Sequence, residues 1–326
     1  MRVGNLWCAG TAVFLYASAV FAQGTAEAYP SKAVTVVAAI APGGGIDVEA
    51  RMYTTRISAL MGQQFVLDFK PGAAGTIGAA YVARAKPDGY TLHVVGGGFS
   101  VFPAFYKDLS FDVVKDFAQI SQMSERSSVL QLSPNFPAKN FAEFVVYARA
   151  NPGKVNYGTT GAGSITHLAG AWLADATNSK ITFVHYKGTG PLLIDLMAGR
   201  LDIGSGILAA ALPYVNTGKT RAIAMLNDKR SSLLPGVQTV AEQGVPGYNY
   251  TNWMGFLAPA GIPSAIVAKL SDAFIKVARS PEVVKVLEAE GSLAVGSSPA
   301  QFRQLIITES GRWKKIVEDA GIKVED

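Results

Sequence analysis

The sequence contains almost no cysteine: Cys8 is the single one among 326 residues, and it lies within the apolar N-terminal stretch. Without that stretch, no thiol remains for a disulfide, a thiolate nucleophile or a cysteine-ligated metal. Histidine is almost as rare, with only His93, His167 and His185. No pair of them has the H-x-x-x-H spacing of a helical metal site. We therefore expect neither metal catalysis nor a cofactor.

The chain also lacks blocks of like charge. Lysine and arginine number 29 against 24 aspartate and glutamate residues, yet no block of five or more basic residues occurs. A nucleic-acid partner is therefore not expected. After residue 22, no apolar run approaches the roughly 20 residues that a transmembrane helix needs. We expect the mature protein to be soluble and monomeric.

Residues 1–22 have the pattern of a secretory signal peptide. Arg2 provides a short positive region, and the stretch from Leu6 to Phe21 is apolar. Small residues then favour cleavage after Ala22. Alternative cleavage sites follow Ala19 and Ala28. We expect the chain to be exported and the signal to be removed.

A glycine-rich loop, Ala41 to Asp47, is the most informative feature that is present. The run Val34–Ile40 before it is continuously apolar, as in a buried parallel strand, and a helical pattern follows it. Glycines let backbone N–H groups approach a ligand, and a helix start adds unpaired donors. The loop therefore predicts an anion site at Pro42, Gly43, Gly44 and Gly45. Asp47 falls in the first helical turn, where a capping role competes with ligand contact.

Strand, glycine loop and helix recur after this first unit. Phe65–Phe69 has the pattern of a second strand, and the loop Lys70–Thr76 follows it. The next helix is expected to bury Ile77, Ala80 and Tyr81. A third apolar strand, Tyr90–Val95, ends in another run of glycines. Alternating units of this kind predict an α/β fold with parallel sheets.

The later units indicate a second sheet and a return to the first. We expect two α/β domains, one made of residues 29–124 with 249–326 and the other of residues 125–248. Two crossings, near residues 124 and 248, would join them. Because ligands in open α/β sheets bind at the carboxyl ends of strands, the cleft between the domains would collect the glycine loops.

These loops are not accompanied by a nucleotide or hydrolase motif. The glycines after Pro42 lack the third glycine of G-x-G-x-x-G, and no G-x-x-x-x-G-K-[ST] is present. Neither Ser164 nor Ser205 stands in G-x-S-x-G. A secreted hydrolase would need Ser164 and His167 to cooperate with Asp202 nearby, and no third group that orients the base is evident. The sequence favours a binding protein over an enzyme.

Several blocks along the chain carry a family resemblance. They are YPSKAVTVVAAIAPGGGIDVEAR, KPGAAGTIGA, KPDGYTL, NPGKVNYGTTGAGSITHLAG, VHYKGTGPLLIDLMAGRLD, PGVQTVAEQGVPGY and FLAPAGIPSAIVAKL. In this order they resemble the Bug-type receptors, the extracytoplasmic solute-binding proteins of tripartite tricarboxylate transporters. The resemblance implies a periplasmic two-domain receptor with the type II periplasmic binding-protein fold. Its partner would be the integral membrane subunits of a transporter or, alternatively, a sensor kinase.

The resemblance also implies a carboxylate ligand in the interdomain cleft, held by backbone amides and bridging waters. In that family the ligand is usually a dicarboxylate, citrate, an aromatic carboxylate or nicotinate. By position, the first domain would contribute Pro42 to Gly45 with Asp47, and then Ala74, Gly75 and Thr76. The second domain would contribute Thr160, Ser164, His167, Lys187 and Gly188.

Two departures from the family pattern bear on the ligand. Asp202, expected to end a strand by the cleft, is followed by Ile203-Gly204-Ser205-Gly206, where the family commonly has bulkier residues. A wider pocket beside Ser205 is therefore expected. Gly97-Gly98-Phe99-Ser100 stands where small polar residues are common, so Phe99 forms either an aromatic platform for the ligand or part of the core. The departures leave an aromatic or larger monocarboxylate open beside the dicarboxylates.

Overall fold

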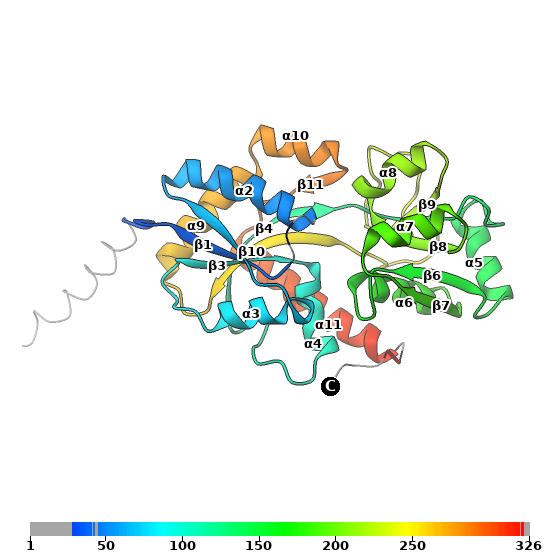
Figure 1. Ribbon diagram of the computed structural model, residues 1–326, viewed down its shortest axis with the longest axis horizontal. Coiled ribbons are helices and arrows are strands. Elements are labelled where there is room, and N and C mark those ends of the chain that lie inside the picture. Colours follow the sequence, from blue (N-terminus) through cyan, green and yellow to red (C-terminus); the bar gives the residue numbers. More distant parts are fainter. Residues whose placement is uncertain (1–27, 41, 43–44, 320, 323–326) are drawn as a thin grey trace, which may run out of the picture.

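The computed structural model describes residues 28–40, 42, 45–319 and 321–322. Two mixed sheets organise these residues and lie side by side along the long axis of the molecule (Figure 1). The predicted signal peptide, Gly43 and Gly44 lie outside the described residues. Within the described part of the chain, no helix has the length and apolar character to cross a membrane.

The first sheet has six strands in the order β11-β4-β10-β3-β1-β2. Its strands are β1 (Val34–Ala38), β2 (Phe65–Phe69), β3 (Thr91–Gly96), β4 (Phe117–Arg126), β10 (Asn252–Pro259) and β11 (Ser292–Ala294). Strand β1 pairs in parallel with β2 and β3, and β10 is antiparallel to both β3 and β4. The helices of this part are α2 (Gly45–Met61), α3 (Thr76–Ala83), α4 (Phe102–Phe105), α9 (Ser264–Ala278), α10 (Pro281–Ala289) and α11 (Pro299–Asp319). Two short 3-10 turns, η1 (Ala73–Gly75) and η2 (Gly97–Val101), follow β2 and β3. We call this part the first lobe.

The second sheet has five strands in the order β7-β6-β8-β5-β9. Its strands are β5 (Ser128–Leu132), β6 (Val155–Thr159), β7 (Ile181–His185), β8 (Ile203–Ile207) and β9 (Arg221–Met225). Strand β6 is parallel to β7 and β8, whereas β5 is antiparallel to β8 and β9. The helices of this second lobe are α5 (Phe141–Ala150), α6 (Ile165–Ala176), α7 (Thr189–Met197) and α8 (Leu208–Asn216). The α/β class predicted from alternating strands and helices is confirmed. The predicted parallel pairing holds for β1 to β3 and for β6 to β8, whereas the other strand pairs are antiparallel.

Helix starts follow the capping signals in the sequence. The Asn140 side chain accepts a hydrogen bond from the Glu143 backbone N–H at 2.9 Å, at the start of α5. At the start of α11, Ser298 Oγ accepts from the Gln301 N–H at 3.3 Å, and Gln301 Oε1 accepts from the Ser298 N–H at 2.9 Å. This reciprocal pair satisfies two donors that the helix cannot satisfy itself.

The chain passes between the lobes at Ser127, which separates β4 from β5, and returns between Met225 and Asn252. The predicted domain boundaries lie close to these passages, and the division into domains stays a prediction. Helix α11 also reaches across: the Trp313 ring packs edge-on against Trp172 of α6, with the ring centroids 6.2 Å apart. A single hydrophobic cluster therefore contains residues of both lobes.

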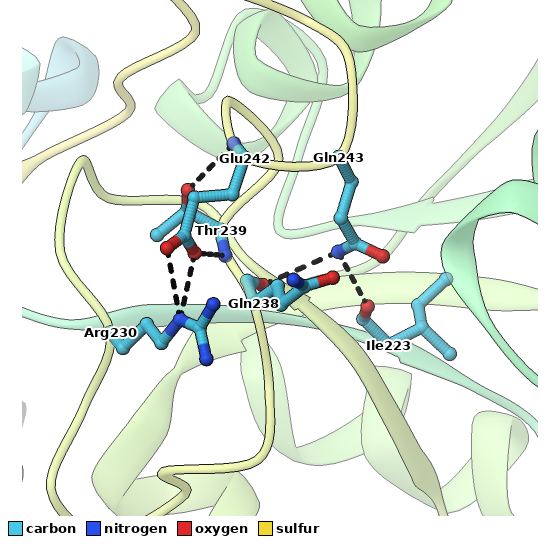
Figure 2. A network of polar contacts seen from close by, with 6 residues as sticks. All are labelled: Ile223, Arg230, Gln238, Thr239, Glu242 and Gln243. Carbon is cyan, nitrogen blue, oxygen red and sulfur yellow. Dashed lines mark hydrogen bonds and ion pairs between the residues drawn. The ribbon is translucent and has the colours of Figure 1, made fainter.

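The returning segment is held in place by side chains of the block PGVQTVAEQGVPGY together with Arg230 (Figure 2). Glu242 Oε2 accepts from the Thr239 N–H at 2.7 Å, and Thr239 Oγ1 accepts from the Glu242 N–H at 3.0 Å. Arg230 donates from Nε to both Glu242 oxygens, at 3.0 and 2.9 Å. Gln243 Nε2 donates to the Ile223 carbonyl of β9 at 3.1 Å. The block PGVQTVAEQGVPGY thus fixes a connection between the lobes.

Candidate functional site

A cavity of about 110 Å³ opens in the first lobe at the carboxyl ends of β1 and β3. The start of α2 contributes Ile46 to its lining, η1 contributes Ala74 and Gly75, and η2 contributes Gly98 and Phe99. The structure thus brings together three of the residues that the sequence predicts for the ligand, namely Ala74, Gly75 and Phe99. This is the sheet edge at which ligands of α/β folds bind.

The loop before α3 has an unusual backbone. Four consecutive residues have positive φ: Gly72 at 132°, Ala73 at 43°, Ala74 at 51° and Gly75 at 106°. Alanine rarely adopts such angles, and backbone strain of this kind clusters at ligand sites. Thr76 Oγ1 donates to the Ala73 carbonyl at 2.9 Å and so holds the turn. The loop leads directly into the N-terminus of α3. The N–H groups of Gly75 and Thr76 donate within the turn, to the Gly72 and Ala73 carbonyls, and the first-turn donors that follow have no acceptor inside the helix.

The first glycine loop is only partly described. Helix α2 starts at Gly45, directly after the predicted anion loop, and Pro42 is exposed. Asp47 lies in the first turn of α2 with 4% of its surface exposed. Its carboxylate forms an ion pair with Arg51 Nε at 2.7 Å, one turn further along the helix. Contact of Asp47 with a ligand stays a prediction.

Phe99 belongs both to the core and to the cavity wall. It is 3% exposed, and its ring lies edge-on to Phe117, Phe102 and His93, with centroid separations of 5.1, 5.7 and 6.1 Å. Gly97, two residues earlier, faces the second lobe. A Cβ atom added to Gly97 would lie 3.1 Å from Ile165 Cδ1 at the start of α6. The η2 turn therefore stands between the cavity and the other lobe.

The facing element of the second lobe is the loop between β6 and α6. Ser164 caps α6, because its Oγ accepts from the His167 N–H at 3.3 Å. Thr166 Oγ1 lies 2.9 Å from the Thr160 N atom, from Thr160 Oγ1 and from Ser164 Oγ. Thr166 was not among the residues predicted for the site, although it orients both Thr160 and Ser164. Only its position in the first turn of a helix after a glycine loop could have indicated this role.

His167 is held as a neutral imidazole. Its Nδ1 accepts from the Gly163 N–H at 3.1 Å, so the ring proton is carried by Nε2. The ring packs against Phe183 and His185, with both centroid separations 4.8 Å. Burial, together with the neighbouring His185, lowers the pKa of His167 to about 4. The histidine therefore offers a hydrogen bond and no positive charge at neutral pH.

This depressed pKa predicts an acid-side loss of stability. The unfolded chain, with an ordinary histidine pKa of 6.5, binds a proton before the folded chain does. Stability from His167 is thus present above pH 6.5 and lost as the pH falls towards 4. We expect the difference in urea-unfolding free energy between wild type and His167→Gln to be smaller at pH 5 than at pH 7. An equal difference at the two pH values would contradict this interpretation.

Ser164 does not have the surroundings of a nucleophile. Its Oγ meets Thr166 Oγ1 and the His167 backbone N–H, and no hydrogen bond joins it to an imidazole nitrogen among the contacts of the described residues. His167 Nδ1 is already occupied by Gly163. A serine nucleophile needs a base within hydrogen-bonding reach, itself oriented by a third group. The geometry gives no support to the secreted hydrolase.

Three further residues predicted for the ligand site lie in the second lobe. Lys187 is exposed after β7, and Gly188, with φ 100°, precedes the first residue of α7 at the same end of the sheet. Ser205 lies inside β8 opposite Leu130 and is 2% exposed. Its contact with a ligand stays a prediction.

Asp202 was expected to end a strand by the cleft, and that placement is wrong. Strand β8 begins after it, at Ile203, and Asp202 Oδ2 accepts from the Asn156 N–H at 2.8 Å. Because β8 is parallel to β6, with Ile203 opposite Tyr157, Asp202 lies at the amino ends of these strands. The loop at Thr160 leaves from the opposite, carboxyl end.

Comparison with known proteins places this architecture in one family. A model of the tripartite tricarboxylate transporter family receptors matches residues 49–322. The chain is 28% identical to protein BugT of Bordetella pertussis, over 96% of this chain and 97% of that protein. The fold agrees with those of periplasmic binding proteins, which confirms the predicted fold class.

Two solved structures of similar proteins contain carboxylates. A Rhodopseudomonas palustris protein with adipate is 32% identical, with a TM-score of 0.80 and coverage of 91% of this chain and 100% of that one. MatC from the same organism, with bound malate, is also 32% identical, with a TM-score of 0.76 and coverage of 89% and 100%. Family match, sequence relatives and fold agree, and the chain belongs to the tripartite tricarboxylate transporter family receptors, the Bug-type periplasmic solute-binding proteins.

Proposed function

We propose that this chain is exported to the periplasm, binds a small carboxylate between its lobes and presents it to the membrane subunits of a transporter. The observation that carries the proposal is the strained turn Gly72–Gly75, which runs into the N-terminus of α3 at the wall of the cavity. Helix starts and exposed backbone N–H groups bind anions without a cationic side chain. The adipate and malate of the two similar proteins support a carboxylate as the anion.

The proposed contacts come from both lobes. The first lobe supplies Pro42, Gly43, Gly44, Gly45, Ala74, Gly75, Thr76, Gly97 and Phe99. The second supplies Thr160, Ser164, His167, Lys187, Gly188 and Ser205. Asp47, through its ion pair with Arg51, would stabilise the start of α2, and Asp202 is left out because of its place at the amino ends of the strands.

Closure of the lobes would complete the site. We take residues 29–124 with 249–326 as one domain and residues 125–248 as the other, moving about the two passages. The ligand shifts the balance of open and closed forms by binding the closed form more tightly. Phe99 and the apolar residues around it would contact the part of the ligand beyond its carboxylate. A catalytic role is not proposed, because among the described residues no hydrogen bond joins Ser164 Oγ to an imidazole nitrogen.

Isothermal titration tests the proposal directly. We expect the mature chain to release or take up heat with at least one of adipate, malate, benzoate and nicotinate, and to give none with the corresponding uncharged amide. The amide is the matched control because it keeps the shape of the ligand and removes the anion. Absence of binding to every carboxylate tested, by titration and by thermal shift, would contradict the proposal.

The membrane partner needs a separate experiment. A receptor that serves a sensor kinase would bind its ligand by the same chemistry, so titration does not distinguish it from a transport receptor. Crosslinking of the ligand-loaded chain to membranes, followed by identification of the captured protein, does. Capture of transporter subunits is the expected result, and capture of a sensor kinase alone would overturn the transport role.

A further inference from the structure

A carboxyl group is buried behind the η2 turn. Glu309 lies on α11 and is 2% exposed. Its Oε2 accepts hydrogen bonds from Trp253 Nε1 of β10 at 2.7 Å and from Ser100 Oγ of η2 at 2.9 Å. An isolated buried carboxylate is costly, so a carboxyl in such a place is either paired with a cation or protonated.

The hydrogen bonds of Ser100 indicate whether Glu309 is ionised or protonated. Ser100 Oγ lies 2.7 Å from the Gly97 carbonyl and 2.9 Å from Glu309 Oε2, and both of these oxygens are acceptors when Glu309 is ionised. A serine hydroxyl has one hydrogen to donate, so it cannot serve both fully. A protonated Glu309 removes the conflict: it donates to Ser100 Oγ, and the serine hydrogen is free for Gly97.

The charges around Glu309 are few. Arg312, on the same helix, favours the ionised form, while Glu125 of β4 opposes it. Arg312 also donates to the Asn249 carbonyl at 2.9 Å and lies over the Trp172 ring, so it is not dedicated to Glu309. Tyr250 is a further titratable side chain that interacts electrostatically with Glu309. The uncharged hydrogen-bond partners of Glu309 are Ser100 of η2 and Trp253 of β10. Burial outweighs the donors and raises the pKa of Glu309 to about 7.

The η2 turn, which Glu309 contacts through Ser100, is part of the candidate site. Gly97 begins η2, and the next two residues, Gly98 and Phe99, line the cavity. A Cβ atom on Gly97 would lie 3.1 Å from Ile165 of the second lobe and 3.7 Å from Trp253 Nε1. The same turn therefore touches the cavity, the other lobe and the partners of Glu309.

We propose that Glu309 is a positioning residue for the carboxylate site, and that as a neutral acid it completes the chain Glu309–Ser100–Gly97 that holds η2 in its binding conformation. This role rests on the proposed function. Loss of the proton releases Ser100 from one of its two partners and places a negative charge behind a site for an anion. Ligand binding and protonation of Glu309 therefore favour each other.

The protonation itself is tested without ligand. We expect the indole ¹H–¹⁵N resonance of Trp253, identified by its loss in Trp253→Phe, to titrate with a midpoint near pH 7 in the wild type. Glu309→Gln removes the titrating carboxyl. Because Ser100 and Trp253 both meet Oε2, its amide can keep only one of the two contacts, and its Trp253 resonance should not titrate. A wild-type resonance that is flat between pH 5 and pH 9 would overturn the proposal.

The coupling is tested with the ligand that the titration panel identifies. Between pH 6 and pH 8, where the ligand carboxylate stays ionised, the wild-type Kd should rise with pH, by at most about tenfold per pH unit because one proton is involved. Glu309→Gln should keep one affinity across this range. Glu318→Gln, which alters an exposed carboxyl of the same helix, should retain the wild-type pH dependence.

The outcomes separate this role from the proposed function. Binding with the same pH dependence in the wild type and in Glu309→Gln would overturn the positioning role alone. Failure of the wild type to bind any carboxylate at either pH would overturn the proposed function and this role with it. A titrating Trp253 resonance, together with a pH dependence that is lost only in Glu309→Gln, would establish the role.

Discussion

Replacing Arg126 by methionine is expected to lower the free energy of unfolding by about 3–5 kcal/mol. Arg126 and Glu49 are both buried, with 6% and 8% of their surfaces exposed. Arg126 Nε donates to Glu49 Oε2 at 2.7 Å, and Nη2 contacts the same oxygen. Ser124 Oγ donates to the other oxygen of Glu49. Removing the guanidinium leaves a buried carboxylate without its cation, which is the costly part of the change.

The position of this pair adds a consequence for the passage between the lobes. Arg126 is the last residue of β4, directly before Ser127, and its carbonyl accepts from Asn227 Nδ2 at 3.3 Å. The Asn227 side chain also accepts from the Ser128 N–H at 2.6 Å. The salt bridge thus ties α2 of the first lobe to the point where the chain leaves it.

Urea unfolding at pH 7 measures the effect, with two controls. The double variant Glu49→Gln, Arg126→Met should recover part of the loss, because it also removes the unpaired charge. Arg230→Met breaks a pair whose side chains are 43% and 41% exposed. Because water screens such a pair, its loss should lower the stability far less than Arg126→Met does. A cost below about 1 kcal/mol for Arg126→Met would show that the buried pair is not held as described.

Much of the fold could be predicted because buried parallel strands are apolar along their whole length. The run predicted as the first strand, 34–40, contains β1 at Val34–Ala38, and the second prediction coincides with β2 at Phe65–Phe69. Glycine loops after the strands marked helix starts, as at Gly45 for α2. These signals are local, and a single sequence contains them.

The buried face of α3 could not be predicted in the same way. Ile77 and Tyr81 were expected to face inward, but they are 54% and 50% exposed. The buried positions are Gly78, Ala79 and Val82. A Cβ atom on Gly78 would lie 2.6 Å from Ala39 Cβ, so the helix packs against β1 through its small residues. Periodicity analysis places large apolar residues inside and cannot detect such a close approach.

Parts of the candidate site could not be predicted either, because they depend on contacts between residues far apart in the sequence. Asp202 was placed wrongly because a strand was expected to end there, whereas β8 begins at Ile203. The residues Gly204-Ser205-Gly206 inside β8 lack the apolar pattern that marks a strand in the sequence. Glu309 was not predicted at all. Its contact with Ser100 joins residues 209 positions apart, and nothing near either residue in the sequence indicates the other.

Replacing Gly75 by valine is expected to raise the Kd for the carboxylate by at least about 100-fold, equivalent to roughly 2.7 kcal/mol. Gly75 lines the cavity and has φ 106°, a conformation that a β-branched residue adopts only with strain. A Cβ atom there would already lie 3.4 Å from the Ala39 carbonyl oxygen and from Phe102 Cζ. The two methyl groups of valine therefore have to displace the loop or enter the anion site.

Gly153→Val separates loss of the site from backbone strain. Gly153 also has positive φ, at 76°, but a Cβ atom there meets nothing within 4 Å. It lies in the turn before β6, at the amino end of that strand and away from the cavity. Thermal unfolding followed by circular dichroism should show a lower stability for both variants. In the isothermal titration, only Gly75→Val should lose the heat of carboxylate binding. Equal affinities in the two variants would mean that the turn at Gly72–Gly75 does not bind the anion, because strain alone would then account for everything that the substitution does.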